Sequence, residues 1–63
     1  MVDLIPISLD DEILCLRREI GLRERVYPRW VAQGKMKHDN AEREIAVMKS
    51  ALESLHRLKG LEK

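Results

Sequence analysis

The sequence predicts an all-α protein: a two-helix antiparallel hairpin that is kinked near Pro28 and packs into a helical oligomer. Apolar residues recur at intervals of three and four along two stretches, the spacing of one helix face, and no strand signal accompanies them. A chain of 63 residues buries only about 60% of its unfolded surface, and its one cysteine cannot form an internal disulfide. Association with other copies is the remaining route to stability, and a marginal monomeric hairpin is the alternative. We expect a single domain, residues 1–63, with residues 1–8 as an extended arm.

The first helix is expected to begin next to Ser8, because Ser8 and Asp11 have the spacing of a capping box. Pro6 disfavours a helical Ile5, so the preceding arm is predicted to be extended. The apolar residues of this arm either pack on a neighbouring subunit or are disordered. A main apolar stripe follows, with a weaker one beside it: the first is Leu9, Ile13, Leu16 and Ile20, and the second is Cys15, Leu22 and Val26.

Pro28 is the main interruption of this first helix, since its ring disfavours a helical Tyr27 and removes a backbone donor. Either the helix kinks there, or it ends and a short new helix begins at Pro28. Gly34 suits a C-terminal helix cap, which makes residues 34–37 the predicted turn.

The second helix is expected to begin between Lys37 and Asn40, with Asp39 and Glu42 as a capping pair, and to end near Gly60. Its apolar spacing of four and three favours packing at a shallow angle against another helix: Ala41, Ile45, Met48, Leu52 and Leu55. Three further residues widen this seam, so that it can also contact another subunit: Val47, Ala51 and Leu58. The predicted core of the oligomer pairs the two helices and comprises Ile13, Leu16, Ile20, Ile45, Met48, Leu52 and Leu55.

Charge is segregated along the chain, although the net charge is only +1. Residues 1–16 carry four acids and no base, residues 17–38 carry a net charge of +5, and residues 39–63 are neutral. This pattern suits head-to-tail or antiparallel contacts between subunits. The near-neutral total argues against a general nucleic-acid coat protein, for which a pI above about 9 is expected.

The basic middle segment is rich in arginine and holds both aromatic residues, which indicates a site for a planar ligand that carries phosphate. Arginine forms bidentate contacts with phosphate, and an aromatic ring stacks on a base. The arginines share one helix face if the helix continues through Pro28. In the structural interpretation, which the residues taken alone favour, the aromatic residues extend the apolar stripe into the core and the arginines pair with acidic groups. Contact with a nucleic-acid backbone is a third, less favoured interpretation. The candidate ligand-binding residues are Arg18, Arg25, Tyr27, Arg29 and Trp30.

The sequence has no pattern of a catalytic or metal centre, and we expect a non-enzymatic protein without cofactor or metal. His38 and His56 are 18 residues apart, so a hairpin places them at opposite ends. Cys15 lies among apolar neighbours and is interpreted as a small buried hydrophobic residue. The three glycines are isolated, so none forms a phosphate-binding loop. No apolar stretch approaches the roughly 20 residues of a membrane span.

The middle of the chain resembles a family of short proteins encoded by tailed bacteriophages and prophages. The resemblance extends from Ile13 to Leu55 and rests on a core written VYPRWV, followed downstream by EIAVM. It departs from the family at Lys35, where arginine is usual, and at Lys37-His38, where a Ser or Thr cap often stands. These departures concern the start of the second helix.

The resemblance implies a binding role in the cytoplasm of a bacterial host and carries over no catalytic residues. Small accessory phage proteins commonly act by binding: some oligomeric ones sequester nucleotide signals of host immunity, and others inhibit a host protein. By analogy, the first hypothesis is an anti-defence sponge that captures a small anionic nucleotide at subunit interfaces. The second hypothesis is an interaction module whose apolar arm or spare helix face binds a host or phage protein.

Overall fold

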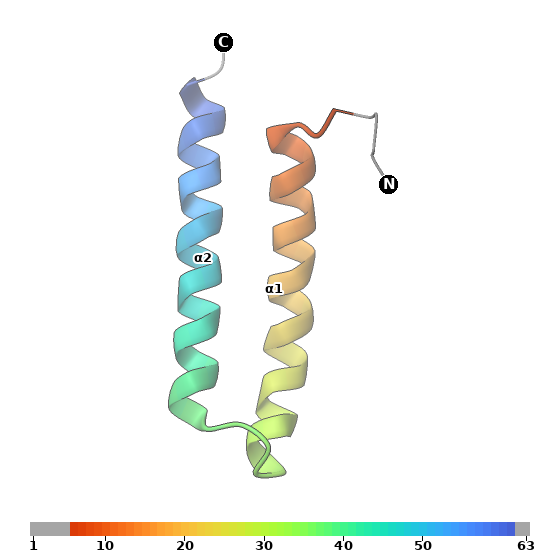
Figure 1. Ribbon diagram of the computed structural model, residues 1–63, viewed down its shortest axis with the longest axis vertical. Helices are drawn as coiled ribbons and strands as arrows, with labels where there is room; N and C mark the ends of the chain where they lie inside the picture. Colours follow the sequence, from red (N-terminus) through yellow and green to blue (C-terminus); the bar gives the residue numbers. More distant parts are fainter. Residues whose placement is uncertain (1–5, 62–63) are drawn as a thin grey trace.

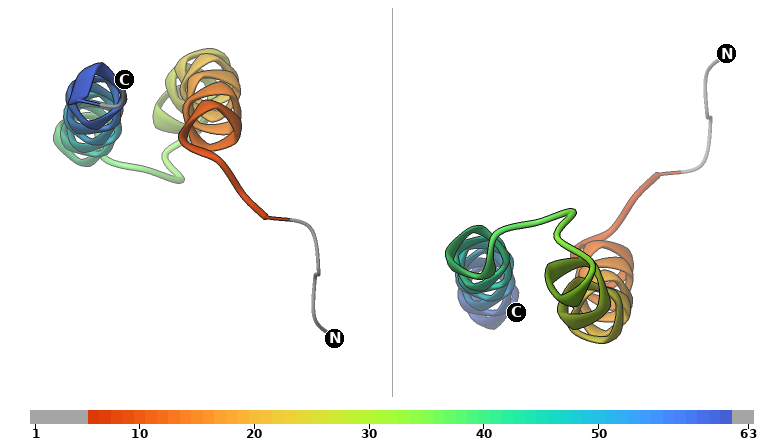
Figure 2. Two further views of the ribbon diagram at one scale, coloured as in Figure 1. Left: turned by 90° about the horizontal axis from the view of Figure 1, so that it is seen from above. Right: turned by 90° about the horizontal axis from the view of Figure 1, so that it is seen from below.

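The computed structural model describes residues 6–61, which form two antiparallel α-helices arranged as a hairpin (Figure 1). Helix α1 spans Leu9–Ala32 and helix α2 spans His38–Leu61, with 24 residues in each. Seen along their axes, the two helices lie side by side (Figure 2). The predicted all-α hairpin is therefore confirmed. Most of the predicted arm, residues 1–5, lies outside the described residues, and Ile7 ahead of α1 is 70% exposed.

The start of α1 is a capping box, as predicted. The Ser8 hydroxyl accepts a hydrogen bond from the backbone N–H of Asp11 at 3.1 Å, and the Asp11 carboxylate accepts one from the backbone N–H of Ser8 at 3.2 Å. Two backbone groups that the helix cannot pair by itself are thereby satisfied. The first turn also carries acidic side chains, which interact favourably with the positive end of the helix dipole: Asp10, Asp11 and Glu12.

Helix α1 continues through Pro28 and ends four residues later, at Ala32. Of the two predicted alternatives, the one in which the helix ends and a new one begins at Pro28 is therefore wrong. The kink stays a prediction. Proline has no N–H to donate to the carbonyl of Glu24, so the helix loses one hydrogen bond at this point. Residues on both sides of Pro28 nevertheless keep one helical register, which fixes the faces on which they lie.

The end of α1 is a Schellman motif with Gly34 in the left-handed conformation, at φ +76°. The N–H of Gly34 donates to the carbonyl of Val31 at 3.0 Å, and the N–H of Lys35 donates to the carbonyl of Trp30 at 2.9 Å. These bonds satisfy carbonyls that the last helical turn leaves open. The predicted glycine cap is confirmed, and it reverses the chain toward α2.

Replacing Gly34 with alanine should destabilise the hairpin by about 1–2 kcal/mol, because a Cβ disfavours the left-handed conformation. A Cβ at Gly34 would meet no atom within 4 Å, so the loss would be conformational and not steric. Gly21→Ala is the matched control, since Gly21 lies inside α1 with the same free space. Alanine there should raise stability by about 1 kcal/mol. Urea unfolding followed by circular dichroism measures both changes, and equal signs would contradict the assignment.

Helix α2 begins at His38, inside the predicted window of residues 37–40. Asp39 therefore lies in the first turn and not ahead of it, where a capping residue stands. The predicted capping pair of Asp39 and Glu42 is wrong for this reason. The helix passes the predicted end at Gly60 by one residue and ends at Leu61.

The contact between α1 and α2 buries few side chains. Ile13, Ile20 and Tyr27 are buried at intervals of seven along α1, and Ala41 is buried on α2. The other members of the predicted core are only half-buried: Leu16, Ile45, Met48, Leu52 and Leu55. The two predicted stripes thus face one another within one hairpin, yet each keeps part of its apolar surface open.

Ion pairs between described residues connect the helices at different levels. Glu24 and Lys49 approach to 2.9 Å, and Asp10 and Lys59 approach to 3.0 Å near the open end of the hairpin. All four side chains are substantially exposed, so each pair contributes about 0–1 kcal/mol. The pairs favour this helix register more than they stabilise the fold.

Candidate functional site

The three candidate arginines lie on the outer face of α1. Arg18, Arg25 and Arg29 are spaced by seven and four residues, which places them within about 40° of one another around a continuous helix. Tyr27, nine residues after Arg18, lies about 180° away on the side that packs against α2. All three arginines are exposed. The shared face that the sequence required is therefore present, and it points away from the second helix.

Tyr27 is a core residue of the hairpin, with only 3% of its surface exposed. Its hydroxyl donates to a carboxylate oxygen of Glu44 on α2 at 2.6 Å and accepts from the guanidinium of Arg23 at 2.8 Å. The Arg23 Nε in turn donates to Glu19 at 3.3 Å. Four side chains thus form one hydrogen-bonded chain across the two helices.

Because Tyr27 is buried in the contact between the helices, neither face of its ring is open to a ligand. The prediction that Tyr27 stacks on a ligand is therefore wrong. The hydrogen bond with the Tyr27 oxygen, followed by that with Glu19, raises the pKa of Arg23 above its ordinary value. The charged guanidinium holds the side chains of Tyr27 and Glu19 in place through these hydrogen bonds.

Trp30 is the aromatic residue that remains accessible, with 42% of its surface exposed. Its ring lies 5.7 Å from the Tyr27 ring, centroid to centroid, at an interplanar angle of 35°. It follows Arg29 and forms part of a shallow hollow of about 250 Å³ with Leu22 and Val26. The five predicted ligand residues are therefore divided: three arginines lie outside, Tyr27 lies inside, and Trp30 lies on the flank between them.

Apolar side chains of both helices lie on one side of the hairpin. The hollow of Leu22, Val26 and Trp30 on α1 has Arg23 on its border, and Arg23 also borders a second hollow with Val47 and Met48 of α2. The weaker stripe of the first helix and the widened seam of the second therefore open onto the same side. The sequence showed both stripes, but it did not show that they lie on the same side of the hairpin. That depends on how each helix is rotated when the two helices pack together. We define the apolar flank as Leu22, Val26, Trp30, Val47, Ala51 and Leu58.

Cys15 is exposed, so its interpretation as a buried hydrophobic residue is wrong. It lies seven residues before Leu22 and thus on nearly the same face of α1, beside the apolar flank. The apolar neighbours that suggested burial include Leu14, which is itself 63% exposed.

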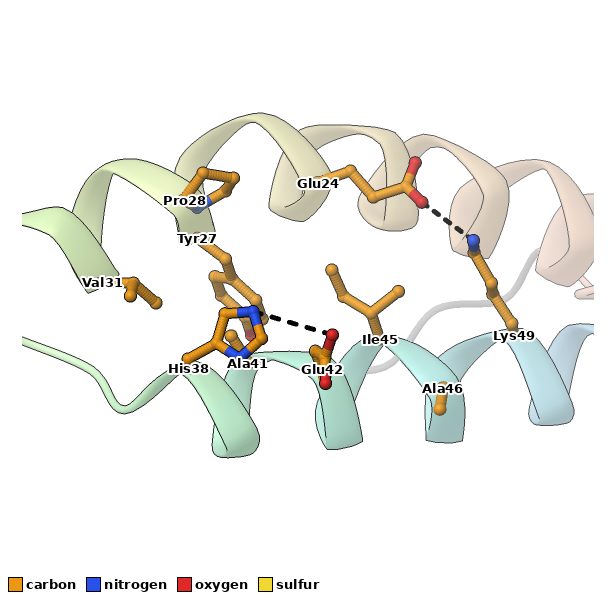
Figure 3. Close-up of a pocket in the computed structure, with 10 residues that line it drawn as sticks. All are labelled: Glu24, Tyr27, Pro28, Val31, His38, Ala41, Glu42, Ile45, Ala46 and Lys49. Carbon is orange, nitrogen blue, oxygen red and sulfur yellow. Dashed lines mark ion pairs between the residues drawn. The ribbon is translucent and has the colours of Figure 1, made fainter.

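A groove of about 640 Å³ opens on the opposite side of the hairpin, near the turn (Figure 3). Its walls combine apolar side chains with Glu24, His38, Glu42 and Lys49, and the small side chains of Ala41 and Ala46 leave room opposite Pro28. The ion pair of Glu24 and Lys49 closes one end. Sequence reasoning missed this groove, since only the alanines at helical spacing on α2 hinted at it.

The first turn of α2 brings together side chains that could share a cation. One ligand atom from each of His38, Asp39 and Glu42 lies within 4.8 Å of the others, and all three residues are exposed. The positive end of the helix dipole opposes a cation there. His38 and His56 lie 18 residues apart on α2, about 27 Å along the axis, and cannot share a metal.

Comparisons with protein-family models, with curated proteins and with solved structures found no match to this chain. The resemblance to short phage proteins therefore stays a prediction from the residues quoted above. Within residues 6–61, neither helix is long and apolar enough to cross a membrane.

Proposed function

We propose that this chain is a non-enzymatic interaction module that works as a homo-oligomer and binds protein through apolar surface left uncovered by its own hairpin. The observation that carries the proposal is the exposure of large apolar side chains on both helices. Leu22 and Trp30 on α1 are 45% and 42% exposed, and Val47 and Leu58 on α2 are 52% and 50% exposed. Several large apolar side chains exposed on one side of a small protein are typical of a binding face.

The polar groups support a binding role over a catalytic one. Among residues 6–61, no buried side-chain nitrogen or oxygen lacks a hydrogen-bond partner. A partly buried polar cluster joins Tyr27, Glu44, Arg23 and Glu19 to each other. These hydrogen bonds occupy all four side chains in fixing the contact between the two helices.

A tagged chain should retain a protein partner from host lysate at a fixed ratio, and Leu58→Gln should abolish that retention. Arg57→Gln is the matched control, because Arg57 is an exposed neighbour on the same helix that does not belong to the apolar flank. Retention should be unchanged in this control. If no protein is retained by the unmodified chain, or if both variants behave alike, the proposal fails.

A second candidate function is the capture of a small anionic nucleotide, as in an anti-defence sponge of phage type. It is favoured by one observation: α1 continues through Pro28, so Arg18, Arg25 and Arg29 form one exposed basic face. Arginine side chains on a common face can contact several phosphate oxygens at once. Trp30, half-exposed next to Arg29, is the ring available for stacking.

Native mass spectrometry with a panel of nucleotides tests this second function. The unmodified oligomer should gain a discrete nucleotide mass, and the double variant Arg25→Ala with Arg29→Ala should lose it while remaining folded. The control Arg43→Ala with Arg57→Ala removes the same charge from α2 and should leave binding intact. Retained affinity in the first double variant, or an oligomer that stays empty with every nucleotide, contradicts the sponge hypothesis.

A further inference from the structure

We propose that the first partner of the apolar flank is a second copy of this chain, which packs on it in the antiparallel sense to form a four-helix bundle. This inference rests on the proposed function and specifies its partner. It follows from the position of the flank, from the small core of the hairpin and from the distribution of charge along α1.

The flank is one surface to which both helices contribute. Arg23 borders the hollow of α1 and the hollow of α2, so the two apolar stripes lie on the same side of the hairpin with this charged side chain between them. On α1 the flank spans residues 22–30, about 12 Å along the axis, and on α2 it spans residues 47–58, about 16 Å.

A second hairpin on this flank completes the core that one hairpin leaves open. Met48 and Leu55 on α2 are only half-buried and belong to the seam next to Val47, Ala51 and Leu58. In a four-helix bundle, half-buried apolar residues of this kind on each helix point into a shared core. The core then draws on both copies, which matches the need of a short chain for association.

The charges on α1 select the direction of the second copy. The first turn carries Asp11 and Glu12, besides Asp10, which pairs with Lys59, and the last turn carries Arg29. A twofold axis near the midpoint of α1 that reverses the helix direction lays α1 along α1 of the second copy, so the acidic first turn lies at the level of Arg29. A parallel pair would place equal charges at the same level. Helix α2 carries four acids and four bases within its described length, excluding the histidines, and does not oppose this choice.

The mass of the full chain in solution tests the association. Sedimentation equilibrium should give twice the chain mass of 7.4 kDa, and Leu22→Gln should shift it toward the monomer. Leu14→Gln is the matched control: Leu14 is an exposed leucine on α1 that lies about 80° from Leu22 around the axis. This control should keep the dimer mass. A monomeric unmodified chain, an oligomer of more than two copies, or equal effects of the two variants would overturn the inference.

Disulfide trapping tests whether the second copy packs in the antiparallel direction, and it does not place a polar side chain in the flank. Leu22 lies near the midpoint of α1, so antiparallel pairing brings it close to the same residue of the second copy. The double variant Cys15→Ser with Leu22→Cys should therefore form a disulfide-linked dimer under mild oxidation. The unmodified chain is the control, because Cys15 lies about 16 Å along the axis from its equivalent, beyond the reach of a disulfide. Equal linking through both positions would contradict the antiparallel arrangement.

The two tests separate this inference from the function on which it rests. If the chain is monomeric but still loses a lysate partner in Leu58→Gln, the interaction module stands and the second copy is wrong. If the chain is dimeric but retains no other protein, the second copy stands as the partner of the flank and the binding of a different protein is wrong. If the chain is monomeric and retains no protein, both proposals fail.

Discussion

Replacing Tyr27 with alanine should unfold the hairpin at ordinary temperature. Tyr27 is the most buried of the core side chains, and it packs where α1 and α2 approach the turn. Truncating a buried aromatic side chain costs about 3–5 kcal/mol. A chain of this size has a total stability of only about 3–5 kcal/mol. Circular dichroism at fixed protein concentration should therefore show loss of helix, and a cooperative melt close to that of the unmodified chain would contradict the packing.

Tyr27→Phe separates the hydroxyl from the ring. Phenylalanine keeps the apolar contact but removes the donor to Glu44 and the acceptor for Arg23. We expect a folded protein that is less stable by about 1–2 kcal/mol, since the hydrogen bond between the hydroxyl of buried Tyr27 and the charged Glu44 carboxylate is lost. Urea unfolding of Tyr27→Phe, Glu44→Gln and the double variant measures the coupling. Additive effects of the two single changes would show that the hydrogen bond contributes nothing.

Replacing Pro28 with alanine should stabilise the protein, in contrast to most substitutions near the core. Proline inside a helix is about 3 kcal/mol less favourable than alanine, because it lacks the N–H and its ring crowds the preceding turn. Part of the gain is offset by about 0.4–1 kcal/mol, since alanine leaves the unfolded chain more flexible. Loss of ring contacts in the groove offsets a further part, so the expected net gain is about 1–2 kcal/mol.

The midpoint of urea unfolding measures this gain, and amide hydrogen exchange over residues 28–32 locates it. Pro28→Gly is the control, because glycine restores the N–H but is about 1 kcal/mol less favourable in a helix than alanine. It should gain clearly less than alanine does. Lower stability in Pro28→Ala would mean that the ring contributes more by lining the groove than the missing hydrogen bond costs.

Local signals in the sequence were sufficient for most of the helix boundaries. The Ser8 and Asp11 capping box and the Gly34 cap depend on neighbouring residues and on backbone conformation, and both were predicted correctly. The capping pair of Asp39 and Glu42 was wrong because helix α2 begins at His38, two residues earlier than that pair requires. A boundary error of two residues is enough to move a side chain from the cap into the first turn.

The candidate site was harder to predict, because the same residues fit both a buried position and a position on the ligand-binding face. Tyr27 belongs both to the apolar stripe and to the arginine-rich segment, and the sequence left both interpretations open. The structure assigns it to the stripe, with its hydroxyl bonded to Glu44, which is 17 residues away. Cys15 was misplaced for a related reason: apolar neighbours in sequence do not lie on the same side of a helix.

By itself, the sequence determined that this protein is a helical hairpin, where its chain reverses, and how its charge is distributed along the first helix. These properties follow from helix periodicity, from caps and from composition, all of which act over a few residues. Only the tertiary structure decided that α1 passes through Pro28 in one register, that Tyr27 lies inside, and that the two weaker stripes share the apolar flank. The physical reason is that periodicity fixes the angles between residues around one helix, whereas the rotation of one helix against another depends on contacts between residues far apart in the chain.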